Sequence, residues 1–501
     1  MKHIEHRQNI FQQHKLFSLI TSDQIPQDKK LQLMPIMILF VMNFRDMNKW
    51  VIRFDDENDQ FKQTINGNTR EDETHSRLFL EDWRKLGFDT SLNWRISDLL
   101  WWLFFAEDTE VFRKCGVEFM RLNVADQGDP LIRFAHSEAG EACGHVFFET
   151  ITPIATALTA DNGIDYRYFG QYHLDRETGH MLNSTGVFED EALTDDQYRL
   201  SITLSDQMFH IFDTIHDSFY QYITQYCLPD RVPAKNNAIF FDTPCYPDAS
   251  SDLKLPDATK TDATQQPLVK YLLERKQRVE SHEFYQWLQF ADLPAIDKLR
   301  RFFPLWIFDC LGYRDLNHYI INYSSPQNAF EVHVNTVSSN LARHSRLAMA
   351  DWLALELDDH LGWRASDALE FFFLDPMMDK HRRALIKFGM LMLQFEDPFL
   401  RLWFLEILEA SGHAFFHHCQ PVAVTAEQQN GIRLNYLANR HHLVHDHNGK
   451  LLDTIAIKSI PIHQEQVQVI TMFIDTIFDA LEQNLSSSLK FVQANRFFGN
   501  C

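Results

Sequence analysis

The stretch HSRLFLEDW at residues 75–83 returns as HSRLAMADW at residues 344–352, 269 positions further along the chain. Three more motifs recur at nearly the same offset: DPxxR at 129–133 and 397–401, GHxFF at 144–148 and 412–416, and NGI at 162–164 and 430–432. A period this long indicates a duplicated domain and not a solenoid, because each copy is large enough to bury its own core. The sequence therefore predicts two domains, residues 1–228 and residues 268–501.

Between the copies, residues 229–267 contain six of the 17 prolines and have no helical periodicity, so we expect a linker there. Outside the linker, apolar residues recur three and four positions apart, which predicts that each copy is all-α. The pieces that follow Asn162-Gly163 and Asn430-Gly431 are expected to be turns leading into the next helix.

Composition limits the partners and the compartment. The chain has 501 residues, and its formal charge of −22 disfavours nucleic acid and anionic lipid surfaces. The most apolar early run, Leu33 to Phe44, is too short to cross a membrane and contains Pro35, so it predicts a buried helix. Seven cysteines without a CxxC pair, and no visible secretory signal, favour a cytoplasmic protein.

Three helical segments of the first copy place histidines and carboxylates on one helix face. The residues are Glu71 or Asp72 with His75, then Glu138 and Glu141, then His173, Glu177 and His180. The third segment, with spacing i, i+4 and i+7, is the strongest signal. Nitrogen and oxygen donors without sulfur suit non-haem iron or manganese and not structural zinc. The alternative for any single segment is a solvated salt bridge.

This combination resembles the haem-oxygenase-like di-iron oxidases and oxygenases, a family also described as iron-containing redox enzymes. The resemblance implies a helical fold shared with haem oxygenase and the thiaminase-II-like proteins, and a site for two iron ions. The ligands that it implies are Asp72, His75, Glu141, His173, Glu177 and His180, with Glu71 and Glu138 as alternatives and with no separate catalytic residue. Many members have a glutamate seven residues before the first histidine, where this chain has Asn68, so we expect Asp72 to replace it.

The second copy departs from the pattern. Its counterparts of the ligands are His344, Glu409, His441 and His445, and Leu341 stands where the first copy has Asp72. Because a di-iron centre needs anionic ligands to balance the metal charge, we expect this degenerate copy to bind metal weakly or not at all. A single metal on the histidines near 441–447 is the alternative. The two copies would then pack as an internal pseudo-dimer within a monomer.

We therefore expect an enzyme that uses iron and O₂ to oxidise a small organic substrate, an amine, amino acid or fatty acid, with an electron donor as its other partner. Two alternatives stay open, a haem-binding oxygenase-like protein and a non-catalytic helical scaffold. The chain has no phosphate-binding loop, GxSxG elbow or HExxH motif. Residues that recur in both copies are predicted to hold the fold: Asp82 and Asp351, Trp83 and Trp352, His145 and His413.

Overall fold

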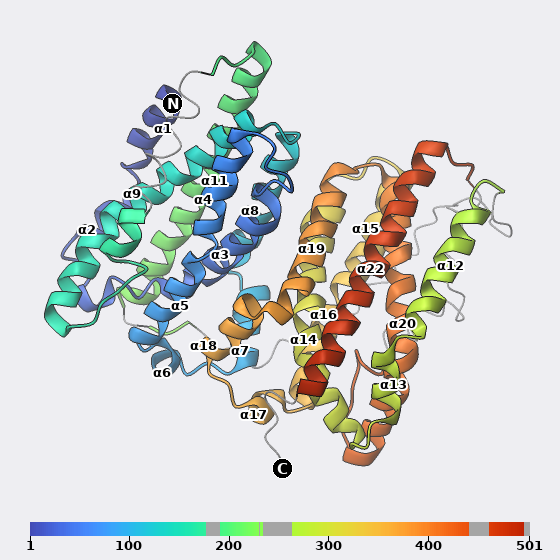
Figure 1. The fold of residues 1–501 in the computed structure, drawn as a ribbon. Coiled ribbons are helices and arrows are strands. Elements are labelled where there is room, and N and C mark those ends of the chain that lie inside the picture. Colours follow the sequence, from blue (N-terminus) through green and yellow to red (C-terminus); the bar gives the residue numbers. More distant parts are fainter. Residues whose placement is uncertain (177–190, 230, 234–262, 440–459, 495–501) are drawn as a thin grey trace. The chain divides into compact units, whose positions relative to one another are not determined.

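The computed structural model describes residues 1–176, 191–229, 231–233, 263–439 and 460–494, and these residues form helices and no strand. The all-α prediction is confirmed. The chain divides into two compact units (Figure 1). Unit 1 is Met1–Lys235 with Arg364–Leu374, and unit 2 is Asn236–Trp363 with Asp375–Cys501. The segment 364–374 belongs to the second copy by sequence, but its contacts place it in unit 1. Most of the predicted linker lies outside the described residues.

Unit 1 is a helical bundle in which α9 packs against α11, and α8 and α3 lie beside them. Residues 171–176 are also helical. The elements of unit 1 are α1 (Lys2–Phe11), α2 (Lys15–Thr21), η1 (Gln27–Lys29), α3 (Met34–Met47), η2 (Asn48–Ile52), α4 (Gln60–Asp72), α5 (His75–Lys85), α6 (Phe88–Leu92), α7 (Ile96–Phe104), α8 (Glu110–Ala125), α9 (Pro130–Asn162), α11 (Asp195–Tyr222), η3 (Ile223–Cys227), α18 (Ala365–Leu369) and η5 (Glu370–Leu374).

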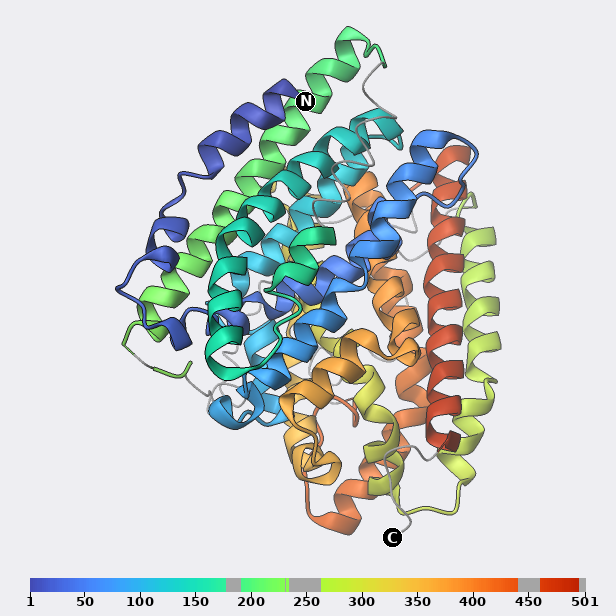
Figure 2. The ribbon, with the colours of Figure 1, turned by 60° about the vertical axis from the view of Figure 1, so that its left-hand side comes forward.

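Unit 2 is a second bundle in which α20 packs against α22, and α12 runs alongside α22 (Figure 2). Ion pairs from Arg275 to Asp475 and Asp479 join α12 to α22. The elements of unit 2 are α12 (Gln266–Glu280), α13 (Glu283–Phe290), α14 (Ala295–Asp315), η4 (Leu316–Ile321), α15 (Ala329–Ala342), α16 (His344–Ala354), α17 (Leu357–Leu361), α19 (Pro376–Gln394), α20 (Pro398–Asn430) and α22 (Gln464–Ala494).

The repeated motifs mark the ends of the two longest helices. Helices α9 and α20 each have 33 residues and begin at the proline of the DP motif. The Asp129 carboxylate accepts the Leu131 N–H at 2.9 Å, and Asp397 accepts the Leu400 N–H at 3.0 Å, so each aspartate caps its helix. Each helix ends at the asparagine of the NG motif, and the glycine that follows has a positive φ, which favours glycine. After Gly163 a non-helical stretch leads into the helical residues 171–176, as predicted. In the second copy residues 432–439 are non-helical, and the helix expected after them lies outside the described residues.

A recurrent arginine ties each long helix to a π-helical turn. The Arg133 guanidinium donates to the Ile52 carbonyl at 2.9 Å, where η2 ends, and Arg401 donates to the Ile321 carbonyl at 2.8 Å, where η4 ends. Carbonyls at a helix end have no partner within the helix, so a buried arginine that satisfies them stabilises the turn. The repeated DPxxR motif therefore specifies both a helix start and a tertiary contact.

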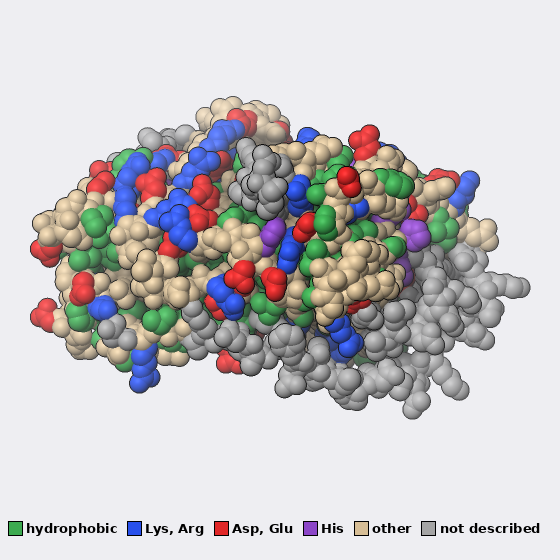
Figure 3. Space-filling model, turned by 90° about the horizontal axis from the view of Figure 1, so that it is seen from below, with side chains coloured by type: hydrophobic (Ala, Val, Ile, Leu, Met, Phe, Trp, Pro, Cys, Tyr) green, Lys and Arg blue, Asp and Glu red, His purple; other side chains and the backbone are tan. Residues whose placement is uncertain are grey.

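The predicted buried helix over Leu33 to Phe44 is confirmed, because α3 covers it and most of its side chains are buried. None of the described helices is both long and apolar enough to cross a membrane. Five of the cysteines are buried free thiols, Cys115, Cys143, Cys227, Cys310 and Cys419. On the face drawn in Figure 3, acidic and basic side chains lie interspersed, and hydrophobic side chains form small groups among them.

Candidate functional site

The structure brings together two of the predicted ligands, His75 and His173. His75 is the first residue of α5, and His173 lies in the helical segment 171–176, about a hundred positions later. The ring centroids are 4.0 Å apart and the rings are inclined by 65°. Both side chains are buried, and the Phe148 ring of α9 lies 4.0 Å from His173 on another side. The imidazoles therefore meet in an interior that largely excludes water.

A backbone hydrogen bond determines how the His173 ring is oriented and protonated. Its Nδ1 lies 2.8 Å from the Tyr168 carbonyl oxygen. A carbonyl only accepts, so Nδ1 carries the proton, and in the neutral ring Nε2 then carries the lone pair. Histidines that ligate metals commonly have this arrangement, with one ring nitrogen donating to a carbonyl and the other facing the metal.

Asp82 holds the loop that supplies the Tyr168 carbonyl. Its carboxylate accepts backbone N–H groups from Arg167 at 3.0 Å, Tyr168 at 2.9 Å and Phe169 at 3.2 Å. Burial raises the pKa of Asp82 to about 6, although these N–H groups and the charge of Lys85 lower it. At Gly170 a Cβ would lie 2.1 Å from the Tyr166 carbonyl oxygen, so only glycine fits there. The recurrent aspartate thus positions a predicted ligand indirectly.

The second copy repeats this device. Asp351 accepts backbone N–H groups from Asn435, Tyr436 and Leu437 at 2.6, 3.0 and 2.7 Å, and burial raises its pKa to about 7. The recurrent tryptophans also behave alike, since Trp83 donates to Asp89 at 3.0 Å and Trp352 donates to Asp358 at 2.8 Å. The prediction that these recurrent residues hold the fold is confirmed for both pairs.

The carboxylates of the first and second predicted segments line one cavity of unit 1. Asp72, Glu138 and Glu141 border it, together with Asn68 and the rings of Phe44, Phe119, Phe134 and Phe212, and its volume is about 50 Å³. Asp72 and Glu138 are each only 4% exposed. Glu138 and Glu141 both face this space, so both remain candidates for the second-helix ligand. Polar groups gathered at a phenylalanine-rich cavity are what a buried cation would require.

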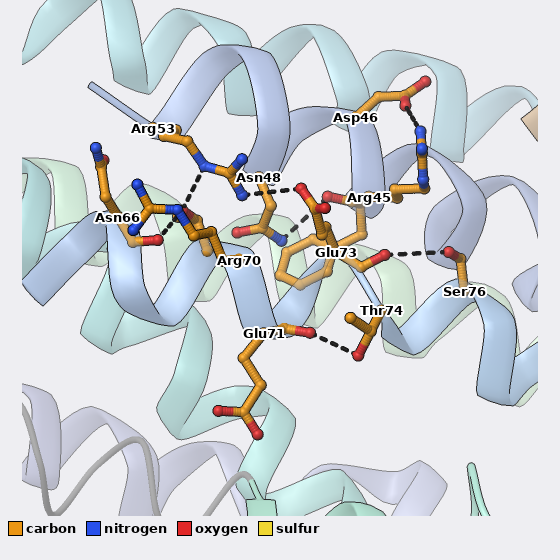
Figure 4. A network of polar contacts seen from close by, with 12 residues as sticks. Arg45, Asp46, Asn48, Arg53, Asn66, Arg70, Glu71, Glu73, Thr74 and Ser76 are labelled. Carbon is orange, nitrogen blue, oxygen red and sulfur yellow. Dashed lines mark hydrogen bonds and ion pairs between the residues drawn. The ribbon is translucent and has the colours of Figure 1, made fainter. Parts of the chain in front are cut away.

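A network of polar contacts holds the turn between α4 and α5, which connects Asp72 to His75 in the chain (Figure 4). The Arg53 guanidinium pairs with Glu73 at 2.9 Å and donates to the Thr69 hydroxyl at 3.1 Å. The Thr74 hydroxyl donates to the Glu71 carbonyl at 2.7 Å, while the Glu71 carboxylate points away from this network (Figure 4). That carboxylate pairs with Arg176 at 2.5 Å. Glu71 thus has a salt-bridge role, which favours Asp72 as the ligand.

The remaining predicted ligands divide between the described residues and those outside them. Glu177 and His180 of the first copy, and His441 and His445 of the second, lie outside the described residues. Within the described parts of the chain, no group of three or more His, Cys, Asp or Glu side chains is close enough to hold a metal ion. The described part of the candidate site therefore consists of the histidine pair and the carboxylate-lined cavity, and two of the three residues of the third-helix stripe lie outside the described residues.

In the second copy, His344 and Glu409 line a larger cavity, of about 110 Å³. Burial and the nearby Glu406 raise the pKa of Glu409 to about 7. Leu341 lines the same cavity, in the place that Asp72 occupies in the first copy. His145, the recurrent histidine of α9, lies 3.1 Å from the Glu149 carboxylate on its own helix, which is a structural contact.

Sequence reasoning missed two buried charged clusters. In unit 1, Asp126 lies 2.7 Å from Arg133 and 3.2 Å from His136. In unit 2, Asp309 lies 2.5 Å from His381. Arg133 and His136 lie on α9 and Asp126 directly follows α8, whereas Asp309 and His381 lie on α14 and α19. No shared motif connects the two clusters, so only the recurrence of Arg133 as Arg401 gave any signal. Comparison of the chain with protein-family models and with characterised proteins finds no match.

Proposed function

We propose that unit 1 binds iron at His75, His173 and the neighbouring carboxylates, and that the protein is a non-haem iron oxidase or oxygenase, with two iron ions, acting on a small organic substrate. The observation that carries the proposal is the hydrogen bond from His173 Nδ1 to the Tyr168 carbonyl, beside the His75 ring. A histidine with one ring nitrogen donating to a backbone carbonyl has the orientation that is common among metal-ligating histidines.

The donor chemistry fits iron. The residues that would hold it are Asp72, His75, Glu138 or Glu141, and His173, with Glu177 and His180 expected from the same helix as His173. Imidazole nitrogens and carboxylate oxygens suit ferrous iron, and buried carboxylates balance its charge. When bound, such a centre supplies electrons for the reduction of O₂ and thereby the oxidation of an organic substrate.

The chain's own residues would orient the ligand His173 and would limit the access of water to the site. Asp82 fixes the loop that orients His173, and the Phe148 ring packs against the His173 imidazole. Phenylalanines line the cavity that the carboxylates border, and such apolar walls would limit the access of water to the carboxylates. A cavity of about 50 Å³ leaves no room for a haem, because even benzene occupies an engineered cavity of about 150 Å³. The haem-binding alternative therefore gains no support from unit 1.

The test is iron content of the full chain after anaerobic loading with Fe(II) and removal of weakly held metal. The matched variants are His75→Ala and His344→Ala, which change the same position of the HSRL motif in the two copies. We expect two irons in the wild type, retained in His344→Ala and lost in His75→Ala, with unchanged far-UV circular dichroism in both variants.

Two results would contradict the proposal. One is a wild type that holds no iron, with or without O₂ and candidate amine, amino-acid or fatty-acid substrates. The other is an equal loss of iron from both variants, which would place the metal away from the His75–His173 pair. Should His75→Ala fail to fold, His173→Gln replaces it, since glutamine keeps a polar side chain of similar length.

A further inference from the structure

The cavity of unit 2 is larger than that of unit 1 and is lined by a different kind of surface. It has a volume of about 110 Å³ and lies among α14, α15, α16, α20 and α22. Its walls include the aromatic rings of Trp306, Tyr313, Phe415, Phe416 and Tyr436. The second copy, which lacks the full metal-ligand pattern, therefore has an aromatic-lined cavity at this place.

Two polar side chains on this wall have hydrogen-bonding capacity that the described residues do not use. Asp309 and Asn484 both line the cavity and are 4% and 6% exposed. The Oδ2 of Asp309 accepts from His381 Nδ1 at 2.5 Å and from Asn484 Nδ2 at 3.1 Å. The Asp309 Oδ1 and the Asn484 Oδ1 are buried and accept no hydrogen bond from any described residue. Two buried acceptors at one cavity call for a donor from outside the protein.

The first copy shows that the fold does not need a carboxylate at the position of Asp309. At the offset of the HSRL motif, Asp309 corresponds to Phe40, and in unit 1 the Phe40 ring packs against Phe119 and Phe212 at 6.4 and 5.8 Å. A buried carboxylate costs free energy that a phenylalanine does not. A carboxylate that stands in a buried position where the other copy has a phenylalanine therefore indicates a role in binding.

The charge and shape of the wall specify the ligand. Two carboxyl groups, Asp309 and Glu409, border the cavity, and no described residue that lines it is Lys or Arg. The Trp306 and Phe415 rings stack at 4.3 Å, and the Phe416 and Tyr436 rings meet edge to face at 5.1 Å. Acceptors and aromatic faces together suit a cation that has N–H donors and a short apolar body. We propose that the unit 2 cavity binds a small primary amine in its ammonium form.

The size of the cavity limits the amine. Benzene, with six carbon atoms, occupies an engineered cavity of about 150 Å³, so 110 Å³ admits roughly four or five non-hydrogen atoms. Isobutylamine has the right size and carries one ammonium group. Isobutanol has the same shape without the charge, and isobutyrate carries the opposite charge. These three compounds separate the amine proposal from general apolar binding.

The experiment is isothermal titration calorimetry of the full chain, treated with a chelator so that iron in unit 1 plays no part. We expect one molecule of isobutylamine to bind per chain, at least tenfold more tightly than isobutanol, and isobutyrate not to bind. If the cavity holds only water, the titration will show no saturable binding at millimolar isobutylamine, and that result would overturn the proposal. Equal affinity for the amine and the alcohol would also overturn it.

Two variants locate the binding. Asp309→Asn removes the charge and keeps the shape, and we expect it to weaken amine binding at least tenfold. Gly412→Leu adds a side chain on the cavity wall without removing a polar group, and a Cβ there would meet only the Phe416 ring at 4.0 Å. It should abolish binding even if Asp309→Asn does not fold. Binding unchanged in Gly412→Leu would place the amine elsewhere and refute the proposal. None of these results depends on iron in unit 1.

Discussion

His216 should make unit 1 sensitive to acid. It lies in α11, is 2% exposed, and packs against the rings of Phe11, Phe17 and Phe219 at 4.8, 5.4 and 5.4 Å. Burial lowers its pKa to about 3, although its hydrogen bond to the Phe212 carbonyl opposes the shift. The folded protein therefore keeps this ring neutral at pH values where the unfolded chain protonates it.

The sign and size of the effect follow from proton linkage. Between pH 6.5 and 3 the unfolded state binds more protons at this residue than the folded state, so stability falls as the pH falls. With an unfolded pKa of about 6.5, the loss between pH 7 and pH 5 is about 2 kcal/mol, and the loss between pH 7 and pH 3 is about 4 kcal/mol.

The perturbation is His216→Phe, which fits the aromatic surroundings and cannot be protonated. We expect it to remove about 2 kcal/mol of the stability difference between pH 7 and pH 5, whatever its effect at neutral pH. The control is His210→Gln on the same helix, since His210 is exposed. Urea unfolding of the metal-free full chain at each pH, fitted with one transition per unit, measures the differences. Equal pH slopes for wild type and His216→Phe would refute the reasoning.

Two further predictions concern the recurrent aspartates and the thiols. Asp82→Ala leaves three buried N–H groups without their acceptor, so we expect a loss of about 3 kcal/mol in unit 1 and weaker iron binding, measured by urea unfolding and metal analysis. Asp351→Ala should cost a similar amount in unit 2 and leave iron binding intact; equal iron loss in both would argue against an orienting role for Asp82. Burial raises the pKa of the Cys115 thiol to about 12, so Cys115 should react with a thiol reagent only after unfolding, as labelled peptides would reveal by mass spectrometry. We expect the same of the other buried thiols, which are Cys143, Cys227, Cys310 and Cys419. Labelling of any of these cysteines in the folded protein would contradict the prediction.

The sequence alone determined the helical class and the duplication, because those signals are local or repeated. The DP motif caps a helix through the aspartate next to the proline, and the NG motif ends it through a positive φ at glycine. Both operate within a few residues, so a short local motif is enough to specify where α9 and α20 begin and end. Asp82 and Trp83 recur in the second copy, which lacks the full ligand pattern, and this recurrence identified both residues as structural.

Only the tertiary structure decided which side chains meet. The rings of His75 and His173 are in contact because the packing of α5 brings them to the segment 171–176. The neighbouring carboxylates differ, since Glu71 pairs with Arg176 and Asp72 lines the cavity. Asp309, His381 and Asn484 lie on three helices far apart in the chain, with no motif to connect them. Their contacts depend on the rotation and packing of whole helices, which are set by burial of apolar faces summed over many residues and are not encoded in any single stretch.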